Sequence, residues 1–173
     1  EERGSQLAGR AKVTPDGLLP AVADFTDWSA LGLHRPITRL ADGTDLTEAV
    51  DDGTLPSYVP RDKDYLLRPE VHEGVRLLVV CGPSAAGKTR TALEAVRSRW
   101  GSWQLLVPTG MRALTGLLDD AFDFRHVVVW LDEVQDLLET ADGVEQMRRL
   151  LAGPGPTVLV AAIEAGAEDL LRG

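Results

Sequence analysis

The chain has one cysteine and three histidines in 173 residues. Cys81 therefore cannot form a disulfide within the chain, and we expect it to be a small buried residue at the end of a strand. The histidines do not lie at the spacing of metal ligands. No apolar run reaches the length of a membrane span, and the N-terminus lacks the apolar core of a secretory signal. We expect a cytoplasmic protein without a membrane partner.

Positive charge is also scarce. Lysine and arginine together number 18 against 27 acidic residues, which gives a net charge of -9. Such a chain repels polyanions, so nucleic-acid binding is disfavoured. The hydrophobic share of 44% is ordinary for a globular protein. The length allows one full core and little room for a second domain.

The chain has two regions that differ in composition and in hydrophobic periodicity. Residues 1–74 are rich in proline, glycine and aspartate and have no long periodicity, which predicts an irregular arm with a solvated acidic loop at 42–52. Residues 75–173 alternate short apolar runs with helical patterns, which predicts a three-layer α/β core around a mostly parallel sheet. The chain begins with glutamate and stops within a helical pattern, so we expect a core truncated at its C-terminus and cut from a longer protein.

The core contains four apolar runs and three helical patterns. The expected strands are residues 76–81, 103–108, 126–131 and 157–163. The expected helices are residues 88–100, 111–122 and 144–153. In the first helix Ala92, Leu93, Val96 and Trp100 fall on one face.

The segment "GPSAAGKT", residues 82–89, is suited to binding phosphate groups. Phosphate binding needs several backbone N–H groups that point to one spot, and hence a tight loop with small side chains. Gly82 and Gly87 permit unusual backbone angles. The residues between them that let a triphosphate approach the main chain are Ser84, Ala85 and Ala86.

Two side chains at the end of this loop have the chemistry of nucleotide binding. Lys88 can reach the β- and γ-phosphates and assist catalysis, and the Thr89 hydroxyl can ligate Mg²⁺. The loop follows a predicted strand and opens a predicted helix, which aims a helix N-terminus at the anion. The alternative is a glycine turn that carries Lys-Thr by chance. The expected nucleotide-binding residues here are Gly82, Pro83, Ser84, Ala85, Ala86, Gly87, Lys88, Thr89 and Arg90.

A pair of carboxylates follows the apolar run of residues 127–131. In an open parallel sheet, ligands bind at the carboxyl ends of the strands, so Asp132 and Glu133 can meet the phosphates. We expect Asp132 to hold the Mg²⁺ shell and Glu133 to deprotonate the attacking water. The alternative is that the pair only caps a following helix. A glutamate beside the metal-binding aspartate favours ATP hydrolysis over phosphate transfer to a small molecule.

These motifs resemble those of a known family. "GPSAAGKT" and "VVVWLDE" are similar to the Walker A and Walker B motifs of P-loop ATPases with an additional catalytic glutamate, the AAA+ and STAND group. Residues 57–67, "SYVPRDKDYLL", resemble more weakly the segment before the phosphate loop in STAND proteins. By that resemblance Tyr58, Val59 and Arg61 line the adenine side of the site. The resemblance covers about residues 55–170 and extends to large multidomain bacterial signalling ATPases.

The resemblance implies a strand order of 5-1-4-3-2, with residues 157–163 beside the phosphate-loop strand. Two features depart from the family. Ala162, Ile163 and Glu164 occupy the place of a polar sensor of the γ-phosphate, so either Glu164 points away or sensing is lost. No fifth strand, helical lid or arginine finger is visible before Gly173.

The leading functional hypothesis is a Mg-ATP-binding, weakly hydrolysing switch or motor core of a STAND/AAA+-like signalling ATPase. Its partners would be other domains of the parent chain or like subunits. Two alternatives stay open. One is a non-catalytic, nucleotide-stabilised interaction module. The other is a small-molecule phosphotransferase; such an enzyme should have an arginine-rich lid over its acceptor, and the candidate segment 110–122 contains only Arg112. GTP also stays open, although no Asn-Lys-x-Asp guanine motif is present.

Overall fold

The computed structural model describes residues 2–33, 55, 57–62, 64, 76–132, 134, 139–153 and 156–164. Its four strands are β1 (Leu77–Gly82), β2 (Gln104–Leu106), β3 (Val127–Leu131) and β4 (Thr157–Glu164). They form one sheet in the order β1-β4-β3-β2, and every neighbouring pair is parallel. The α/β class is therefore confirmed, as is the expected position of residues 157–163 beside the strand that precedes the loop. A fifth strand is not present among the described residues.

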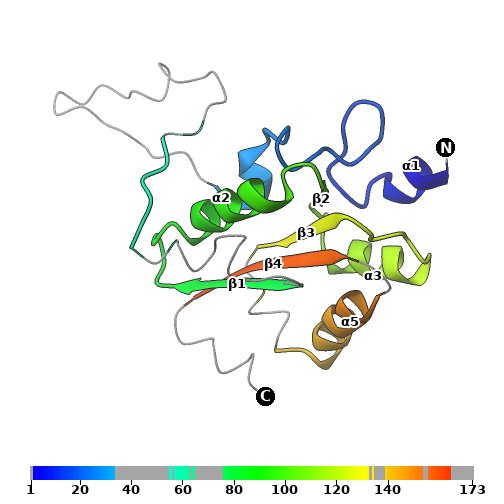
Figure 1. Ribbon diagram of the computed structural model, residues 1–173. Coiled ribbons are helices and arrows are strands. Elements are labelled where there is room, and N and C mark those ends of the chain that lie inside the picture. Colours follow the sequence, from blue (N-terminus) through cyan, green and yellow to red (C-terminus); the bar gives the residue numbers. More distant parts are fainter. Residues whose placement is uncertain are drawn as a thin grey trace, which may run out of the picture.

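Helices cover both faces of the sheet. Helix α2 (Lys88–Trp100) lies on one side, and α3 (Met111–Asp119) and α5 (Ala141–Ala152) lie on the other (Figure 1). All five residues of β3 are buried. Val127, Val129 and Leu131 join the core beneath α3 and α5, while Val128 and Trp130 join the core beneath α2. A strand buried on both faces reads as a continuous apolar run, which is why this strand was recognisable from sequence.

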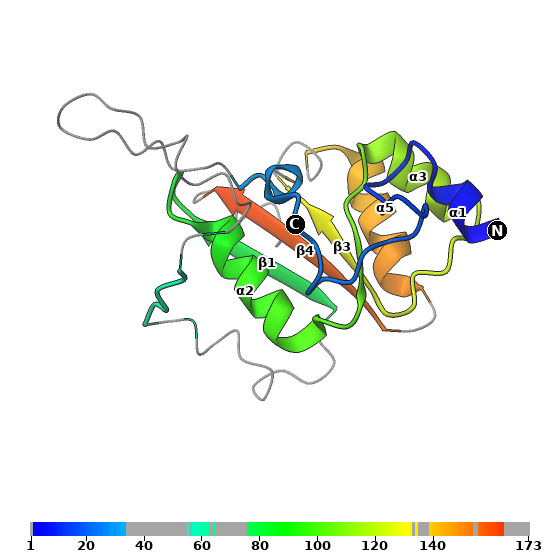
Figure 2. The same ribbon diagram turned by 90° about the horizontal axis from the view of Figure 1, so that it is seen from above.

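Helix α2 follows its sequence pattern closely. Ala92, Leu93, Val96 and Trp100 are buried against the sheet, as predicted. Figure 2 shows the helix running along β1. Because β1 and α2 are joined only by residues 83–87, this packing fixes the position of the loop between them.

The other two helices differ from their predicted bounds for local reasons. Helix α3 ends at Asp119 rather than 122, because Ala121 takes a left-handed φ of 52°. Helix α5 begins at Ala141 rather than 144, because the Thr140 hydroxyl accepts a hydrogen bond from the Gly143 N–H at 3.1 Å and caps the helix. None of the helices in the described residues is long and apolar enough to cross a membrane.

The N-terminal residues 2–33 run along the edge strand β2. They contain helix α1 (Glu2–Leu7) and the 3₁₀ helix η1 (Trp28–Leu31). Backbone bonds join the arm to the sheet edge: Lys12 N–H donates to the Val107 carbonyl at 3.1 Å, and Leu105 N–H donates to the Pro20 carbonyl at 2.8 Å. This pairing covers an edge that would otherwise expose unpaired backbone groups. The predicted acidic loop at 42–52 lies outside the described residues.

Arm residues also complete both cores. Leu7 and Leu19 are buried with α3 and α5, and Val22, Phe25 and Leu31 are buried with α2. The arm therefore crosses from one face of the sheet to the other around β2. This crossing brings η1 to the carboxyl ends of β2 and β3.

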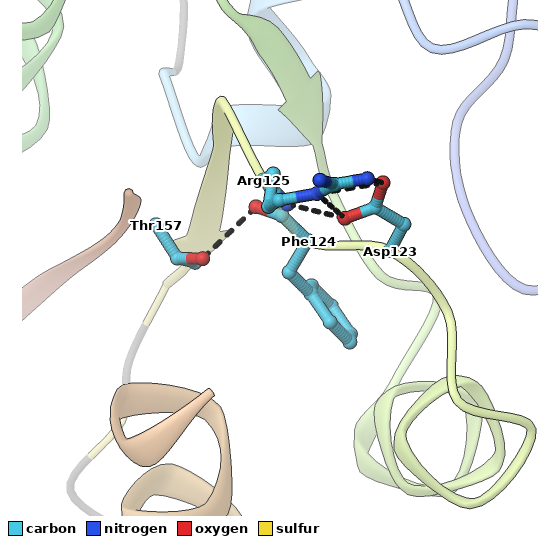
Figure 3. A network of polar contacts seen from close by, with 4 residues as sticks. All are labelled: Asp123, Phe124, Arg125 and Thr157. Carbon is cyan, nitrogen blue, oxygen red and sulfur yellow. Dashed lines mark hydrogen bonds and ion pairs between the residues drawn. The ribbon is translucent and has the colours of Figure 1, made fainter. Parts of the chain in front are cut away.

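A polar network fixes the opposite, amino-terminal edge of the sheet (Figure 3). The Thr157 hydroxyl at the start of β4 donates to the Phe124 carbonyl at 2.9 Å. Arg125 donates through Nε and Nη2 to the Asp123 carboxylate at 2.9 and 2.7 Å, and this partner raises the pKa of the exposed guanidinium. Arg125 thus carries a charge far along the strands from the loop after β1, which makes it a useful control position.

Candidate functional site

The loop between β1 and α2 has the backbone of an anion cradle. Ala85 has φ 58° and Gly87 has φ 75°, so two residues of a five-residue turn are left-handed. Left-handed residues in such turns let successive N–H groups face one spot. Ala85 adopts this conformation without being glycine, and strain of this kind persists where the surrounding structure imposes it, often at binding sites.

The N-terminus of α2 is left open to an anion. Its N-cap, Gly87, offers no side-chain hydrogen bond, and no acidic residue lies in the first turn. Helix α5 is the contrast, with the Thr140 cap and Asp142 in its first turn. A helix N-terminus carries partial positive charge and unpaired N–H groups. Within the described residues, no side-chain acceptor caps these groups in α2.

The Lys88 ammonium lies over the start of the loop. Its Nζ donates to the carbonyls of Gly82 and Pro83, both at 3.0 Å. An ammonium has three N–H donors, so these two bonds leave one for an anion. Thr89 follows in the first turn of α2 and is half-buried.

Tyr58 contacts the first half of α2, and Asp64 contacts Tyr58. The Tyr58 hydroxyl donates to Asp64 Oδ2 at 2.5 Å and lies 3.2 Å from Thr91 Oγ1. Burial, and then the bond to Asp64, raise the pKa of the Tyr58 hydroxyl. The Arg90 guanidinium stacks on the Tyr58 ring, 5.6 Å from its centroid. Val59 is instead 77% exposed.

Arg61 lies against the loop itself. A Cβ built on Gly87 would be 2.5 Å from Arg61 Nη2. The backbone of Arg61 is held by Asp64, whose Oδ2 accepts from the Arg61 N–H at 2.8 Å and whose own N–H donates to the Arg61 carbonyl at 3.0 Å. The guanidinium is thus a second cation at the loop.

Asp132 follows β3 at the carboxyl edge of the sheet, the same edge that carries the loop. Only β4 separates β1 from β3, so the two strands lie about 10 Å apart. The Asp132 carboxylate packs against the arm, since a Cβ on Gly32 would be 1.8 Å from its Oδ2. Glu133 lies outside the described residues. Glu164 is the Cα partner of Gly82, at the level where the loop begins, but its side chain is also outside the description.

A cavity of about 460 Å³ lies beside Asp132. It is mostly apolar and is formed by the ends of β2 and β3, η1 and the cap of α5. Its lining residues are Ala30, Val107, Pro108, Gly110, Met111, Trp130, Leu131, Asp132, Val134 and Thr140. None of the loop residues lines it.

Sequence reasoning missed three participants and misplaced one residue. Asp64, Thr91 and Gly32 were not singled out, although Asp64 stands three residues after Arg61, a spacing at which an aspartate can accept from a backbone N–H. No local signal connects Gly32 with Asp132. Cys81 is exposed rather than buried, because β1 pairs with β4 on one side only within the described residues.

Comparisons with protein-family models, curated proteins and solved structures find no match to this chain.

Proposed function

We propose that the chain binds Mg-ATP through residues 82–90 and hydrolyses it slowly, as the switch or motor core of a signalling ATPase. The observation that carries the proposal is the loop between β1 and α2. It joins a parallel strand to an uncapped helix N-terminus, has left-handed residues at Ala85 and Gly87, and carries Lys88 above it. Backbone amides, helix dipole and ammonium together favour a polyphosphate.

The oxygen donors of Thr89 and Asp132, at the carboxyl edge of the sheet, are of the kind that Mg²⁺ prefers. This ion is usually bound by one or two protein oxygens together with phosphates and water. Thr89 and Asp132 would supply those oxygens from the same edge of the sheet. The described residues contain no group of three His, Cys, Asp or Glu that could hold a metal alone. Bound Mg²⁺ would neutralise part of the phosphate charge.

Hydrolysis is assigned to Glu133 on its place next to Asp132 in the sequence. Water would attack the γ-phosphorus, its proton passing to the Glu133 carboxylate, while the bond from phosphorus to the ADP oxygen breaks. We expect slow turnover. The sequence shows no arginine finger before Gly173. Such a residue raises the rate of phosphoryl transfer by about 10³ to 10⁵, so a neighbouring subunit or domain would have to supply it.

Calorimetric titration with Mg-ATP tests the binding proposal. The wild-type chain should bind, while Lys88→Ala should weaken binding by about 100-fold or more, since it removes a charged donor to the phosphates. Arg125→Ala removes one positive charge at the other edge of the sheet and should bind as wild type. Equal affinity of Lys88→Ala and wild type would remove the proposal. Mg-GTP in parallel titrations tests base preference.

A second function is favoured by the contact between Asp132 and Gly32. If the arm holds Asp132 away from the nucleotide, the chain is a nucleotide-stabilised interaction module that does not turn over. Incubation with γ-labelled ATP separates the functions. Released phosphate supports the ATPase, no product with intact binding supports the module, and a labelled metabolite would indicate a phosphotransferase.

A further inference from the structure

Arg61 is placed at the loop by contacts outside its own side chain. Tyr58 anchors the segment to Thr91 of α2, and Asp64 holds the Arg61 backbone from both the N–H and the carbonyl. These bonds fix the backbone of Arg61 beside the loop, and the Asp64 carboxylate bonds to that backbone and not to the guanidinium. Among the described residues no ion pair joins Arg61 to an acidic side chain.

We propose that Arg61 binds the phosphate groups of the nucleotide from within the same chain, as a second cation beside Lys88. The inference rests on the proposed function. It moves Arg61 from the adenine side, where the family resemblance put it, to the phosphate side.

Geometry favours phosphate over the base. Gly87 is the N-cap of α2, so a group that touches it stands where the helix N-terminus meets its anion. A guanidinium presents a planar fork of donors that matches phosphate oxygens. A binding site for adenine needs apolar side chains packed into walls. Val59, the apolar residue near Arg61, is 77% exposed and so does not form such a wall.

Arg90 does not fill the same role. Its guanidinium pairs with Glu94 at 2.9 Å, one turn along α2, and stacks on the Tyr58 ring. Arg61, beside Lys88, is therefore the arginine whose guanidinium lies at the loop. Glycine at position 87 then has two roles: it permits the left-handed backbone, and it leaves room for the Arg61 guanidinium.

A base-free probe tests the inference. Mg-tripolyphosphate and Mg-ATP are titrated by calorimetry into wild type, Arg61→Ala, Arg61→Lys and the control Arg125→Ala. Arg61→Ala should weaken both ligands by the same factor, about 10- to 100-fold, because a charged contact to phosphate is lost. Arg61→Lys should recover part of the loss, and Arg125→Ala should match wild type.

The other outcomes overturn the inference in distinct ways. Loss for ATP with unchanged tripolyphosphate would make Arg61 a base or ribose contact. Unchanged affinity for both would give it no binding role, and tighter binding would make it a side chain that covers the loop. Circular dichroism and melting temperature establish folding, and Arg61→Lys keeps the test decisive should Arg61→Ala not fold.

Failure of the inference is separable from failure of the proposed function. If wild type binds neither probe, the proposed function fails. If Lys88→Ala loses both probes while Arg61→Ala keeps them, only the role of Arg61 fails.

Discussion

The two halves of the candidate site are built differently. Beside the loop after β1, Tyr58 is joined to Thr91 of α2, and the cations Lys88 and Arg61 contact the loop whose last residue, Gly87, begins α2 without a side-chain cap. The carboxylate after β3 is instead in contact with the arm at Gly32. The first half brings an uncapped helix N-terminus and two cations together, and the second is in contact with another part of the same chain.

This difference suggests that binding and turnover are separable. A ligand held by the loop needs no rearrangement of the arm. Use of Asp132 by a metal-bound nucleotide requires that its contact with Gly32 be compatible with the metal or be given up. Changes at the loop should therefore alter affinity, and changes around Asp132 should alter rate or stability.

The largest effect is expected at Glu133. Glu133→Gln should bind Mg-ATP like wild type but hydrolyse it about 10² to 10⁴ times more slowly, because a general base is lost. Phosphate release under saturating ATP measures this. Glu139→Gln, an exposed glutamate six residues on, serves as the control. A Glu133→Gln rate equal to wild type would dismiss Glu133 as the base.

Gly32→Ala tests the carboxylate half. Its φ of 76° and the 1.8 Å approach to Asp132 Oδ2 should together lower the free energy of unfolding by about 2–4 kcal/mol. Gly17→Ala is the matched control, because its φ is 73° and its Cβ would meet nothing within 4 Å. It should cost only about 1–2 kcal/mol of backbone strain.

Urea unfolding of wild type, Gly32→Ala, Asp132→Ala and the variant with both substitutions makes up a double-mutant cycle, and Gly17→Ala is measured beside it. In the Asp132→Ala background, Gly32→Ala should lower the free energy of unfolding by no more than Gly17→Ala does in the wild-type chain. Equal costs for the two glycines would show that Asp132 does not constrain the arm.

Gly87→Ala tests the loop half. The left-handed φ of 75° and the approach to Arg61 should weaken Mg-ATP binding by about tenfold, the equivalent of about 1.4 kcal/mol. Gly82→Ala is the comparison, since its Cβ would meet Ala86 and Lys88 at an ordinary 3.6 Å. Calorimetry should find Gly82→Ala closer to wild type; the reverse order would contradict the loop geometry.

Tyr58→Phe should have the smallest effect. It removes the hydroxyl that joins Asp64 to Thr91 and should lower the free energy of unfolding by about 1 kcal/mol. Burial raises the pKa of Tyr58, so the folded chain holds the phenol proton more tightly than the unfolded chain. Wild-type stability should therefore fall as the pH rises above the ordinary value of 10.0, and Tyr58→Phe should lack this part of the decline. Parallel pH dependences would place Tyr58 in solvent.

The sequence predicted the sheet well because its strands are continuous apolar runs, and burial on both faces leaves that pattern. Helix bounds were less certain where one residue decides them, as Thr140 does by capping α5. The loop was found because its glycines and Lys88 are local in sequence. The contacts of Arg61 with Gly87 and of Gly32 with Asp132 join distant segments, so no local pattern could indicate them.

The most direct test of the account is the backbone amide spectrum of the chain as Mg-AMP-PNP, a non-hydrolysable ATP analogue, is added. We predict that the largest ¹H and ¹⁵N shift changes fall on the amides of residues 84–90, and that Lys88→Ala abolishes them. Shift changes confined to the cavity residues Gly110 and Met111, with the amides of 84–90 unmoved, would contradict it.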